Sequence, residues 1–535
     1  MEVTVSSIVL SLALVTFLTL AWKALNLLWL RPKQIERCLR EQGFKGNSYR
    51  FLYGDTKDFI SAIKEATSKP MEACNDDVVR RVIAFHRYFV DLHGMNYFAW
   101  LGPTPRLNIT DPKLVKEILS NTEVFQKPAM LKLLLTGIVA YEGEKWAKHR
   151  KLVNPAFQTE KLKVISHIDF FKVLEIDTES MLMVPAMYSS CCEMISKWEA
   201  LVSTKGSCEL DVWPYLSNLT ADVISRTAFG SNFEEGKLIF QLLSEQNDFA
   251  IQHLRSSYIP GSRFLPTKTN RKLRKIYNEL GALLRNIINK RQGTMNGEDG
   301  NSDLLGILLT SNLIDIDQGK LGNKKSIKLT TEEVIEECKL FYQAGQETTA
   351  DLLVWTMVLL SKNQKWQTLA REEILAVFGD NRPDFDRLNQ LKTITMILHE
   401  TMRLYPPAPI LSRYIHRKTK LGGLVLPGGV EIFVPTMEIH HDPEIWGEDS
   451  KCFKPDRFSE GISKATKGQS TFFPFGGGPR ICIGQNFALV EAKIALAMIL
   501  KRFSFQISPS YVHAPLFTLT VQPQHGAHLI LQKLF

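Results

Sequence analysis

One glycine-rich stretch, from Phe473 to Gln485, contains a single thiol and a single cation. Its glycines let the backbone turn tightly and approach a flat ligand that a Cβ would keep away. Arg480 offers a planar set of donors suited to carboxylates. Cys482 precedes a pattern of helical spacing over 486–500, so its sulfur should lie near a helix N-terminus, which favours a thiolate. This combination predicts an axial ligand for haem iron; the alternative is an inert cysteine in a glycine-rich turn.

A second candidate for chemistry is an acid followed by hydroxyl groups within a predicted helix. The helix should begin near Thr330, because Thr330 and Glu333 have the spacing of a capping box. Gly345 costs about 1 kcal/mol of helix stability relative to alanine, and a hydroxyl can bond back to a backbone carbonyl. We therefore expect the helix to open at Gly345, so that Glu347 and Thr348 relay protons through water. The alternative is a helix that merely tolerates a glycine.

Two pairs of side chains with helical spacing are further candidates. Trp146 and Arg150 lie four residues apart and share a helix face, whereas Glu400 and Arg403 lie three apart in a helix predicted over 391–404. Exposed ion pairs contribute little to stability, and a tryptophan packed on the core beside a solvated arginine is the commoner arrangement. If Arg457 joins Glu400, one carboxylate between two guanidinium groups would form a buried structural lock.

The pattern Phe475-x-x-Gly478-x-Arg480-x-Cys482-x-Gly484 resembles the haem loop of cytochrome P450 monooxygenases. The other patterns follow the order of that family, so the resemblance covers nearly the whole chain. It implies haem b (iron protoporphyrin IX), with the Cys482 thiolate as metal ligand. The cofactor contacts that it implies are Trp146, Arg150, Arg413, Phe475, Gly476, Gly478, Arg480, Cys482 and Gly484. It further implies proton delivery by Glu347 and Thr348, and a lock of Glu400, Arg403 and Arg457.

The resemblance also implies a reaction and its partners. Electrons would come from NADPH only indirectly, through a flavoprotein reductase docking on the Cys482 side, where a basic face could include Lys148, Lys151, Lys161 and Lys163. Dioxygen would then be used to hydroxylate or further oxidise a hydrophobic small molecule. Residues 31–37, 42–52 and 514–524 resemble plant enzymes close to secologanin synthase, which implies a terpenoid substrate (triterpenoid, monoterpenoid or gibberellin-like).

Three other functions remain as alternatives. The glycine loop could bind a nucleotide, but it lacks the lysine and Ser/Thr of a phosphate-binding loop. A haem-thiolate isomerase or lyase would not activate dioxygen, and the intact Glu347–Thr348 pair argues against it. A non-enzymatic haem-binding membrane protein is the third.

Composition and charge are those of an ordinary globular protein. The chain has 535 residues, 44% hydrophobic and 23% charged, which is enough for a large core. The net charge of +9 is spread along the chain and favours an acidic partner or an anionic membrane surface over nucleic acid. The eight cysteines lack C-x-x-C spacing, so neither a zinc site nor a disulfide framework is predicted.

The first thirty residues predict a membrane anchor. Residues 3–22 are uncharged and mostly apolar, and about 20 residues at 1.5 Å each span a hydrocarbon core of roughly 30 Å. A cleaved signal peptide fits poorly, because no basic segment precedes the apolar run. We expect a single-pass protein of the endoplasmic reticulum membrane with a cytosolic body and with unglycosylated sequons at Asn108 and Asn218. The basis for this orientation is the positive charge after the apolar run, at Lys23, Arg31, Lys33, Arg37 and Arg40.

Three segments are expected: an anchor over 1–30, a proline- and glycine-containing linker over 31–54 and a haem-thiolate monooxygenase domain over 55–535. Pro32 should end the anchor helix. The fold should be mainly α with small β-sheets (α+β), which is the cytochrome P450 fold with an N-terminal transmembrane helix. A hairpin is predicted over 424–434 and a strand pair over 517–531. Residues 164–182 interrupt the resemblance and read as an insertion or as an artefact of exon assignment.

Overall fold

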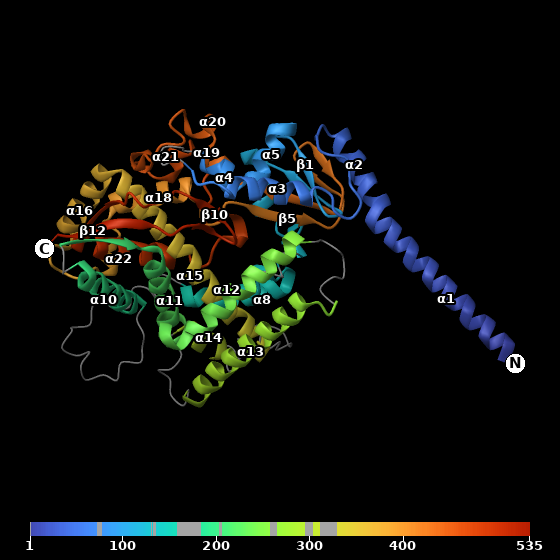
Figure 1. Cartoon of the computed structure of the whole chain (residues 1–535), viewed down its shortest axis with the longest axis horizontal. Coiled ribbons are helices and arrows are strands. Elements are labelled where there is room, and N and C mark those ends of the chain that lie inside the picture. The colour runs from blue at the N-terminus through green and yellow to red at the C-terminus, as the bar shows by residue number, and fades with distance from the viewer. Residues whose placement is uncertain are drawn as a thin grey trace, which may run out of the picture.

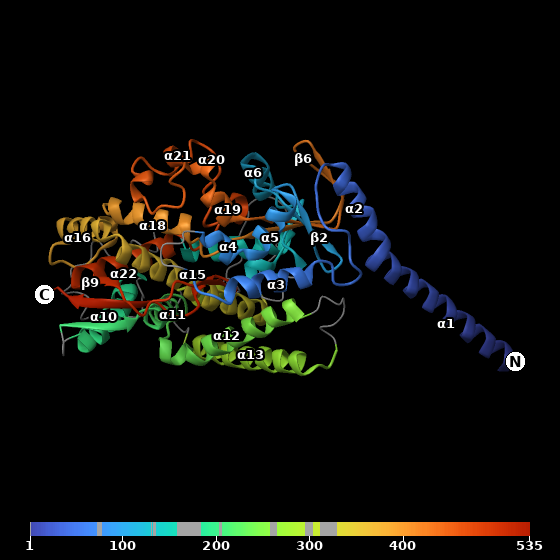
Figure 2. The same ribbon diagram turned by 45° about the horizontal axis from the view of Figure 1, so that its top comes forward.

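The computed structural model describes residues 2–71, 77–129, 131, 135–157, 183–202, 206–256, 265–294, 303–310 and 329–534. They form a helical body with small sheets, from which one long helix projects (Figures 1 and 2). The predicted mainly α fold with small sheets is therefore confirmed. The possible insertion at 164–182 lies outside the described residues, as do Lys161 and Lys163.

The longer helices make up most of the body. Their bounds are α3 Thr56–Thr67, α5 Ala84–His93, α6 Pro112–Ser120, α8 Gly143–Val153, α10 Met183–Val202, α11 Trp213–Phe229, α12 Phe233–Ser256, α13 Lys268–Thr294, α15 Thr331–Lys362, α16 Gln364–Phe378, α18 Lys392–Leu404 and α22 Gln485–Arg502. Shorter elements are α4 Val78–Val82, α7 Gly137–Ala140, η3 Asn154–Phe157, α14 Leu304–Thr310, α17 Phe385–Leu388, α19 Thr436–His441, α20 Pro443–Trp446, η6 Pro455–Phe458, α21 Ile462–Ala465 and η7 Gly478–Arg480.

Helix α15 passes through the middle of the body, in contact with α11, α18 and α22 (Figure 1). The predicted capping box is present, since the Thr330 hydroxyl accepts from the Glu333 N–H and the Glu333 carboxylate accepts from the Thr330 N–H. The predicted opening at Gly345 is wrong, because α15 is helical throughout. A Cβ on Gly345 would stand 2.7 Å from Ile224 of α11, so this glycine permits close helix packing.

In the described part of the chain, four small sheets complete the body. The strands are β1 Phe98–Leu101, β2 Thr104–Asn108, β3 Phe125–Gln126, β4 Ser207–Asp211, β5 Leu411–Ile415, β6 Thr419–Leu421, β7 Leu424–Leu426, β8 Val430–Val434, β9 Phe503–Ile507, β10 Pro515–Phe517, β11 Val521–Pro523 and β12 His528–Lys533. The sheet orders are β1-β2-β8-β5-β3, β4-β12-β9, β6-β7 and β10-β11.

Both predicted strand pairs have the wrong partners. In the segment 424–434, β7 pairs with β6, whereas β8 lies between β2 and β5. In the segment 517–531, β11 pairs with β10 and β12 with β4 and β9. Every residue of β8 is buried, so both faces of this central strand are covered.

The N-terminal helix continues past the predicted end of the anchor. Helix α1 (Glu2–Leu25) passes through a π-helical turn, η1 (Asn26–Leu30), into α2 (Arg31–Glu41). Pro32 does not end the helix, although it lies inside a continuous helical stretch in which its missing N–H leaves one backbone bond unmade. Residues 7–41 include a stretch apolar and long enough to cross a membrane, with none of it buried against the body. Ile35 and Leu39 of α2 are buried, and the Tyr49 hydroxyl donates to the Leu28 carbonyl at 2.8 Å.

Candidate haem site

Cys482 lies in the loop between η7 and α22, as its sequence position predicted. Its N–H donates to the Phe475 carbonyl at 2.9 Å, and the Gly484 N–H interacts with its sulfur. Protein atoms surround the side chain, but the thiol opens into an internal cavity. Burial raises the pKa of the Cys482 thiol, while the Gly484 N–H and the Arg150 charge act in the opposite direction. A metal cation in the cavity would favour the thiolate, because a coordinating thiol is deprotonated.

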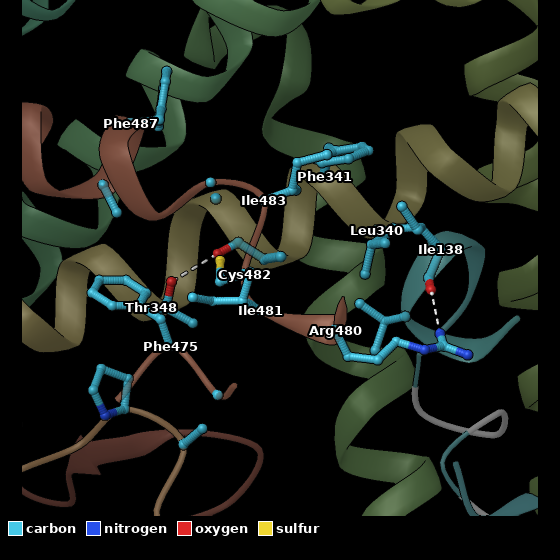
Figure 3. Close-up of a pocket in the computed structure, with 18 of the residues that line it drawn as sticks. Ile138, Leu340, Phe341, Thr348, Phe475, Arg480, Ile481, Cys482, Ile483 and Phe487 are labelled. Atoms are coloured by element: carbon cyan, nitrogen blue, oxygen red, sulfur yellow. Dashed lines mark hydrogen bonds between the residues drawn. The ribbon is translucent and has the colours of Figure 1, made fainter. Parts of the chain in front are cut away.

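The cavity has a volume of about 300 Å³ and a largely apolar wall. Figure 3 shows Phe475, Ile481 and Cys482 of the loop around the same cavity as Phe341 and Thr348 of α15. Further lining residues include Ile138, Val139, Phe157, Ile224, Leu340, Leu352, Met402 and Leu411. Such a wall suits an apolar ligand.

The glycines of the loop have different tasks. Gly476 lines the cavity with a φ of +73°, and a Cβ built on it would meet no atom within 4 Å. The space beside it can therefore take a flat ligand. Gly478 does not line the cavity. It has a φ of +65°, and a Cβ there would stand 2.3 Å from the Leu119 carbonyl oxygen of α6. Gly478 thus serves loop packing, whereas Gly484 lines the cavity and caps α22.

Three buried or half-buried cations gather at one side of the cavity. Arg413 in β5 is buried, and burial together with the nearby Arg480 lowers its pKa to about 10. Arg480 donates to the Tyr141 carbonyl at 2.8 Å and to the Glu142 carboxylate. Lys127 also lines the cavity, and burial and the charges of both arginines hold its pKa well below the usual range.

This excess of positive charge fits the two carboxylates of a haem. Among the described residues, Glu142 is the carboxylate that opposes all three cations, and one anion beside three such cations leaves part of their charge uncompensated. Sequence reasoning found Arg413 and Arg480 but missed Lys127, because no local pattern marks a lysine that reaches the site through tertiary contacts.

Trp146 and Arg150 of α8 also line the cavity, as their shared helix face predicted. The Arg480 guanidinium lies over the Trp146 ring, 4.2 Å from its centroid. Arg150 donates to the Ile481 carbonyl at 3.0 Å. These contacts join α8 to the two residues directly before Cys482.

The two expected proton-delivery residues of α15 face different surroundings. Thr348 lines the cavity, and its hydroxyl donates to the Ala344 carbonyl at 3.0 Å. Glu347 does not line the cavity; Asn247 of α12 donates to its carboxyl group at 3.3 Å. Burial raises the pKa of Glu347 to about 7. Adjacent helix residues point about 100° apart, so the closed helix keeps these two groups separate.

Comparison with known proteins decides the family. The family model for cytochrome P450 matches residues 80–530. The chain is a cytochrome P450 monooxygenase. It is 54% identical to Cytochrome P450 72A397 of Kalopanax septemlobus, over 96% of this chain and 95% of the relative. It is 53% identical to Cytochrome P450 CYP72A219 of Panax ginseng (98% of each chain) and 51% identical to the 7-deoxyloganic acid hydroxylase of Catharanthus roseus (97% of each).

This P450 has the buried ion pair that its sequence predicted. Arg403 donates to both carboxylate oxygens of Glu400 at 2.8 Å, and neither side chain has any exposed surface. Arg457 lies 3.7 Å from Glu400 and donates to the Trp446 and Asp449 carbonyls. The structure thus brings all three members of the expected lock together.

A further residue of this P450 connects the lock to the haem loop. Arg403 donates to the carbonyl oxygen of His440 at 2.8 Å, and the ring of His440 accepts from the N–H of Phe473 at 3.2 Å. Phe473 begins the glycine-rich loop. Sequence reasoning missed His440, because its role depends on contacts 37 and 33 residues away in the chain.

Proposed function

We propose that this P450 hydroxylates or further oxidises a plant terpenoid on a haem held by Cys482, with electrons from NADPH supplied through a flavoprotein reductase. The observation that carries the proposal is the opening of the Cys482 thiol and the Thr348 hydroxyl into one apolar cavity. The Catharanthus roseus relative is named a hydroxylase of 7-deoxyloganic acid, which supports a terpenoid as the substrate class.

The residues of the site fit a haem. Cys482 would ligate the iron, Gly476 would leave room for the ring, and the propionates would be held by Lys127, Trp146, Arg150, Arg413 and Arg480. A haem with a thiolate ligand supplies the activation of dioxygen. The lock that includes Glu400 and Arg403 would keep the loop in position without touching the reacting atoms.

The apolar wall would bind and orient the substrate and exclude bulk water. Apolar side chains of α15 and the segment from Met402 to Leu411 surround the space, so binding would come mainly from hydrophobic burial. Thr348 and Thr349 are the hydroxyl-bearing residues of α15 in this wall, and we assign to Thr348 the hydrogen bond at the reacting centre.

Glu347 would supply protons to this centre. A carboxyl with a pKa of about 7 can both give and regain a proton near neutral pH. Because Glu347 does not line the cavity, delivery requires its side chain to rotate or a water chain to connect it to Thr348.

The reductase would dock near α8, which carries contacts to the Cys482 loop. Lys151 is exposed there. Lys148 lies 3.7 Å from Glu333, and Lys145 lies 3.1 Å from the same carboxylate, so part of the local positive charge is neutralised. Lys151 is accordingly the residue of α8 that we assign first to a basic docking face.

The membrane segment would hold the enzyme at the endoplasmic reticulum with the body in the cytosol, where NADPH-dependent reduction takes place. Apolar terpenoids partition into membranes, so an anchored enzyme meets its substrate at high local concentration. The division into anchor, linker and catalytic domain remains a prediction, and within the proposed linker residues 31–41 are helical.

The test is turnover of the full-length protein in vesicles with a plant reductase and NADPH. Terpenoid carboxylic acids and triterpenoids are first screened for changes in the haem absorption spectrum, and binders are then assayed for oxidised product. We expect at least one to yield an NADPH-dependent hydroxylated product. Spectral binding of fatty acids or phenylpropanoids but of no terpenoid would overturn the substrate class.

A further inference from the structure

The carboxyl group of Glu337 lies beyond the edge of the haem cavity, in α15 one turn before Phe341. Phe341 lines the cavity and Glu337 does not. Glu337 has no exposed surface, yet a hydrogen bond of normal length reaches each of its two oxygens. A buried carboxylate is stable only with such donors, so its place is well determined. The two donors come from two different elements of the cavity wall.

One donor is the backbone of α7, the short helix that contributes Ile138 and Val139 to the cavity wall. The Ile138 N–H donates to one Glu337 oxygen at 3.1 Å. This N–H lies in the first turn of α7, where no carbonyl of the same helix can accept from it. Glu337 therefore holds a residue of the wall directly by its backbone.

The other donor is the ring of His149 in α8, which lies between Trp146 and Arg150 in the sequence. His149 Nδ1 is 2.6 Å from the other Glu337 oxygen, and neither side chain has any exposed surface. A carboxylate can only accept, so the ring nitrogen donates. Because Trp146 and Arg150 line the cavity, Glu337 also fixes the helix that carries these two residues.

Gly137 leaves the space that the contact between α7 and Glu337 needs. Its φ is +58°, and a Cβ built on it would stand 2.6 Å from a Glu337 oxygen. Glycine adopts this conformation readily, whereas alanine would be strained and would push the carboxylate away. The glycine thus shows, independently of the hydrogen bonds, that α7 and Glu337 are fitted to each other.

Two further contacts hold α7 and limit the expected effect of losing Glu337. The Thr136 hydroxyl donates to the Glu336 carbonyl at 3.0 Å, and Arg480 donates to the Ile138 carbonyl at 3.4 Å (Figure 3). Both contacts are independent of the Glu337 side chain. Loss of that side chain should therefore loosen the wall without releasing it.

We propose that Glu337 is a positioning residue that holds the Ile138–Val139 wall and helix α8 against α15, and thereby determines how closely the cavity fits an apolar ligand at the haem iron. Glu337 does not reach the cavity; it acts through Ile138 and His149. The inference goes beyond the proposed function, because it concerns the shape of the cavity and not the identity of the substrate.

The test compares two iron-binding probes in the haem-loaded, full-length protein, titrated by the shift of the haem absorption. Imidazole reports access to the iron, whereas phenylimidazole adds an apolar ring that must pack against the wall. Glu337→Leu keeps roughly the size of the side chain but leaves the Ile138 N–H and the His149 ring without an acceptor. The ratio of the two affinities therefore measures the fit of the wall separately from the haem content.

We expect Glu337→Leu to weaken the binding of phenylimidazole about tenfold, a part of what burial of an aromatic ring contributes. Imidazole should bind within about twofold of its wild-type affinity. Glu337→Gln should bind both probes nearly as wild type does, because the amide oxygen can accept from Ile138 and the amide N–H can donate to His149. Hydrogen exchange of residues 136–141 should be faster in Glu337→Leu and unchanged in Glu337→Gln.

Two other variants serve as a control and as a second route to the same contact. Asp222→Asn is the matched control, because this buried carboxylate accepts from Ser190 of α10 at 2.6 Å and from Arg226 of α11 at 2.7 Å. It should change the stability of the body but not the affinity ratio. Gly137→Ala displaces the Glu337 carboxylate without replacing it and should change the ratio as Glu337→Leu does. It decides the question if Glu337→Leu does not fold.

Three results would overturn the proposal. One is an unchanged affinity ratio in Glu337→Leu with a normal carbon monoxide spectrum. Another is an equal loss in Glu337→Gln, which would assign the effect to the charge of Glu337 instead of its two hydrogen bonds. The third is an equal loss of both probes, which would place the effect at the iron and not at the wall. If no terpenoid is oxidised, the proposed function fails, while the two probes still decide the role of Glu337.

Discussion

Replacement of Glu400 by glutamine should destabilise the body and loosen the haem loop. Glu400 and Arg403 are both fully buried, and two hydrogen bonds of 2.8 Å join them. Glutamine retains the shape but removes the negative charge, which leaves the Arg403 guanidinium buried without its counter-ion. Breaking a buried pair in this way costs about 3–5 kcal/mol.

The other neighbours of Arg403 place the expected cost of Glu400→Gln at the lower end of that range. Its guanidinium also donates to the carbonyl oxygens of His440, Ser450 and Cys452, and those bonds remain in the variant. We therefore expect a loss of about 3 kcal/mol. With an unfolding entropy of about 2.1 cal/mol/K per residue, a body of roughly 480 residues has a total of about 1 kcal/mol/K, so the melting temperature should fall by about 3 °C.

The assay is thermal unfolding of the haem-loaded protein at a fixed scan rate, monitored by circular dichroism and by the haem absorption. The haem signal should be lost at a lower temperature than the circular dichroism signal, because the lock contacts the loop through His440 and Phe473. The matched control is Glu234→Gln, which breaks the exposed Glu234–Lys237 pair at 3.6 Å and should change the melting temperature by less than about 0.5 °C. Equal melting of Glu400→Gln and wild type would refute the reasoning.

Other changes test the haem site and the topology. Lys127→Met should weaken haem retention about 10- to 100-fold, since one charge-assisted hydrogen bond is lost, yet stabilise the haem-free protein; Lys145→Met is the exposed control, and equal haem retention would contradict the assignment. Thr348→Val should keep the haem and its reduction but raise hydrogen peroxide per NADPH by about tenfold, because the hydroxyl of the cavity wall is lost; full coupling would show that protons take another route. In wild type, coupling should fall as pH rises through about 7, because the protonated form of Glu347 is present below that pH and lost above it. Glu347→Gln lacks this acid, so its coupling should no longer change with pH across that range. Protease added to sealed vesicles should digest the body, and protection of the body would reverse the proposed topology.

Local patterns in the sequence predicted the parts of the site that lie within single elements. The Cys482 loop, the shared face of Trp146 and Arg150, and the Thr330 capping box depend on residues close in the chain, and the structure has each of them. Gly345 was predicted to open its helix, but its lack of a side chain serves contact with Ile224 instead. A glycine in a helix can permit either effect, and the sequence alone does not distinguish them.

Groups that reach the site from distant elements could not be predicted. Lys127 and His440 carry no local pattern, and their roles appear only when the segment of Lys127 and α19 pack against the rest of the body. The two strand pairs failed for the same reason. Adjacent strands such as β7 and β8 were expected to pair, yet β8 lies between β5 and β2, and β2 is far away in the sequence.

The central claim is that Cys482 provides a thiolate to haem iron, and the carbon monoxide difference spectrum of the reduced protein tests it most directly. Wild type should show the absorption typical of thiolate ligation. Cys482→His should lose that absorption while the cations of the site still retain haem, which the pyridine haemochrome assay measures. A thiolate-type spectrum that persists in Cys482→His would contradict the account.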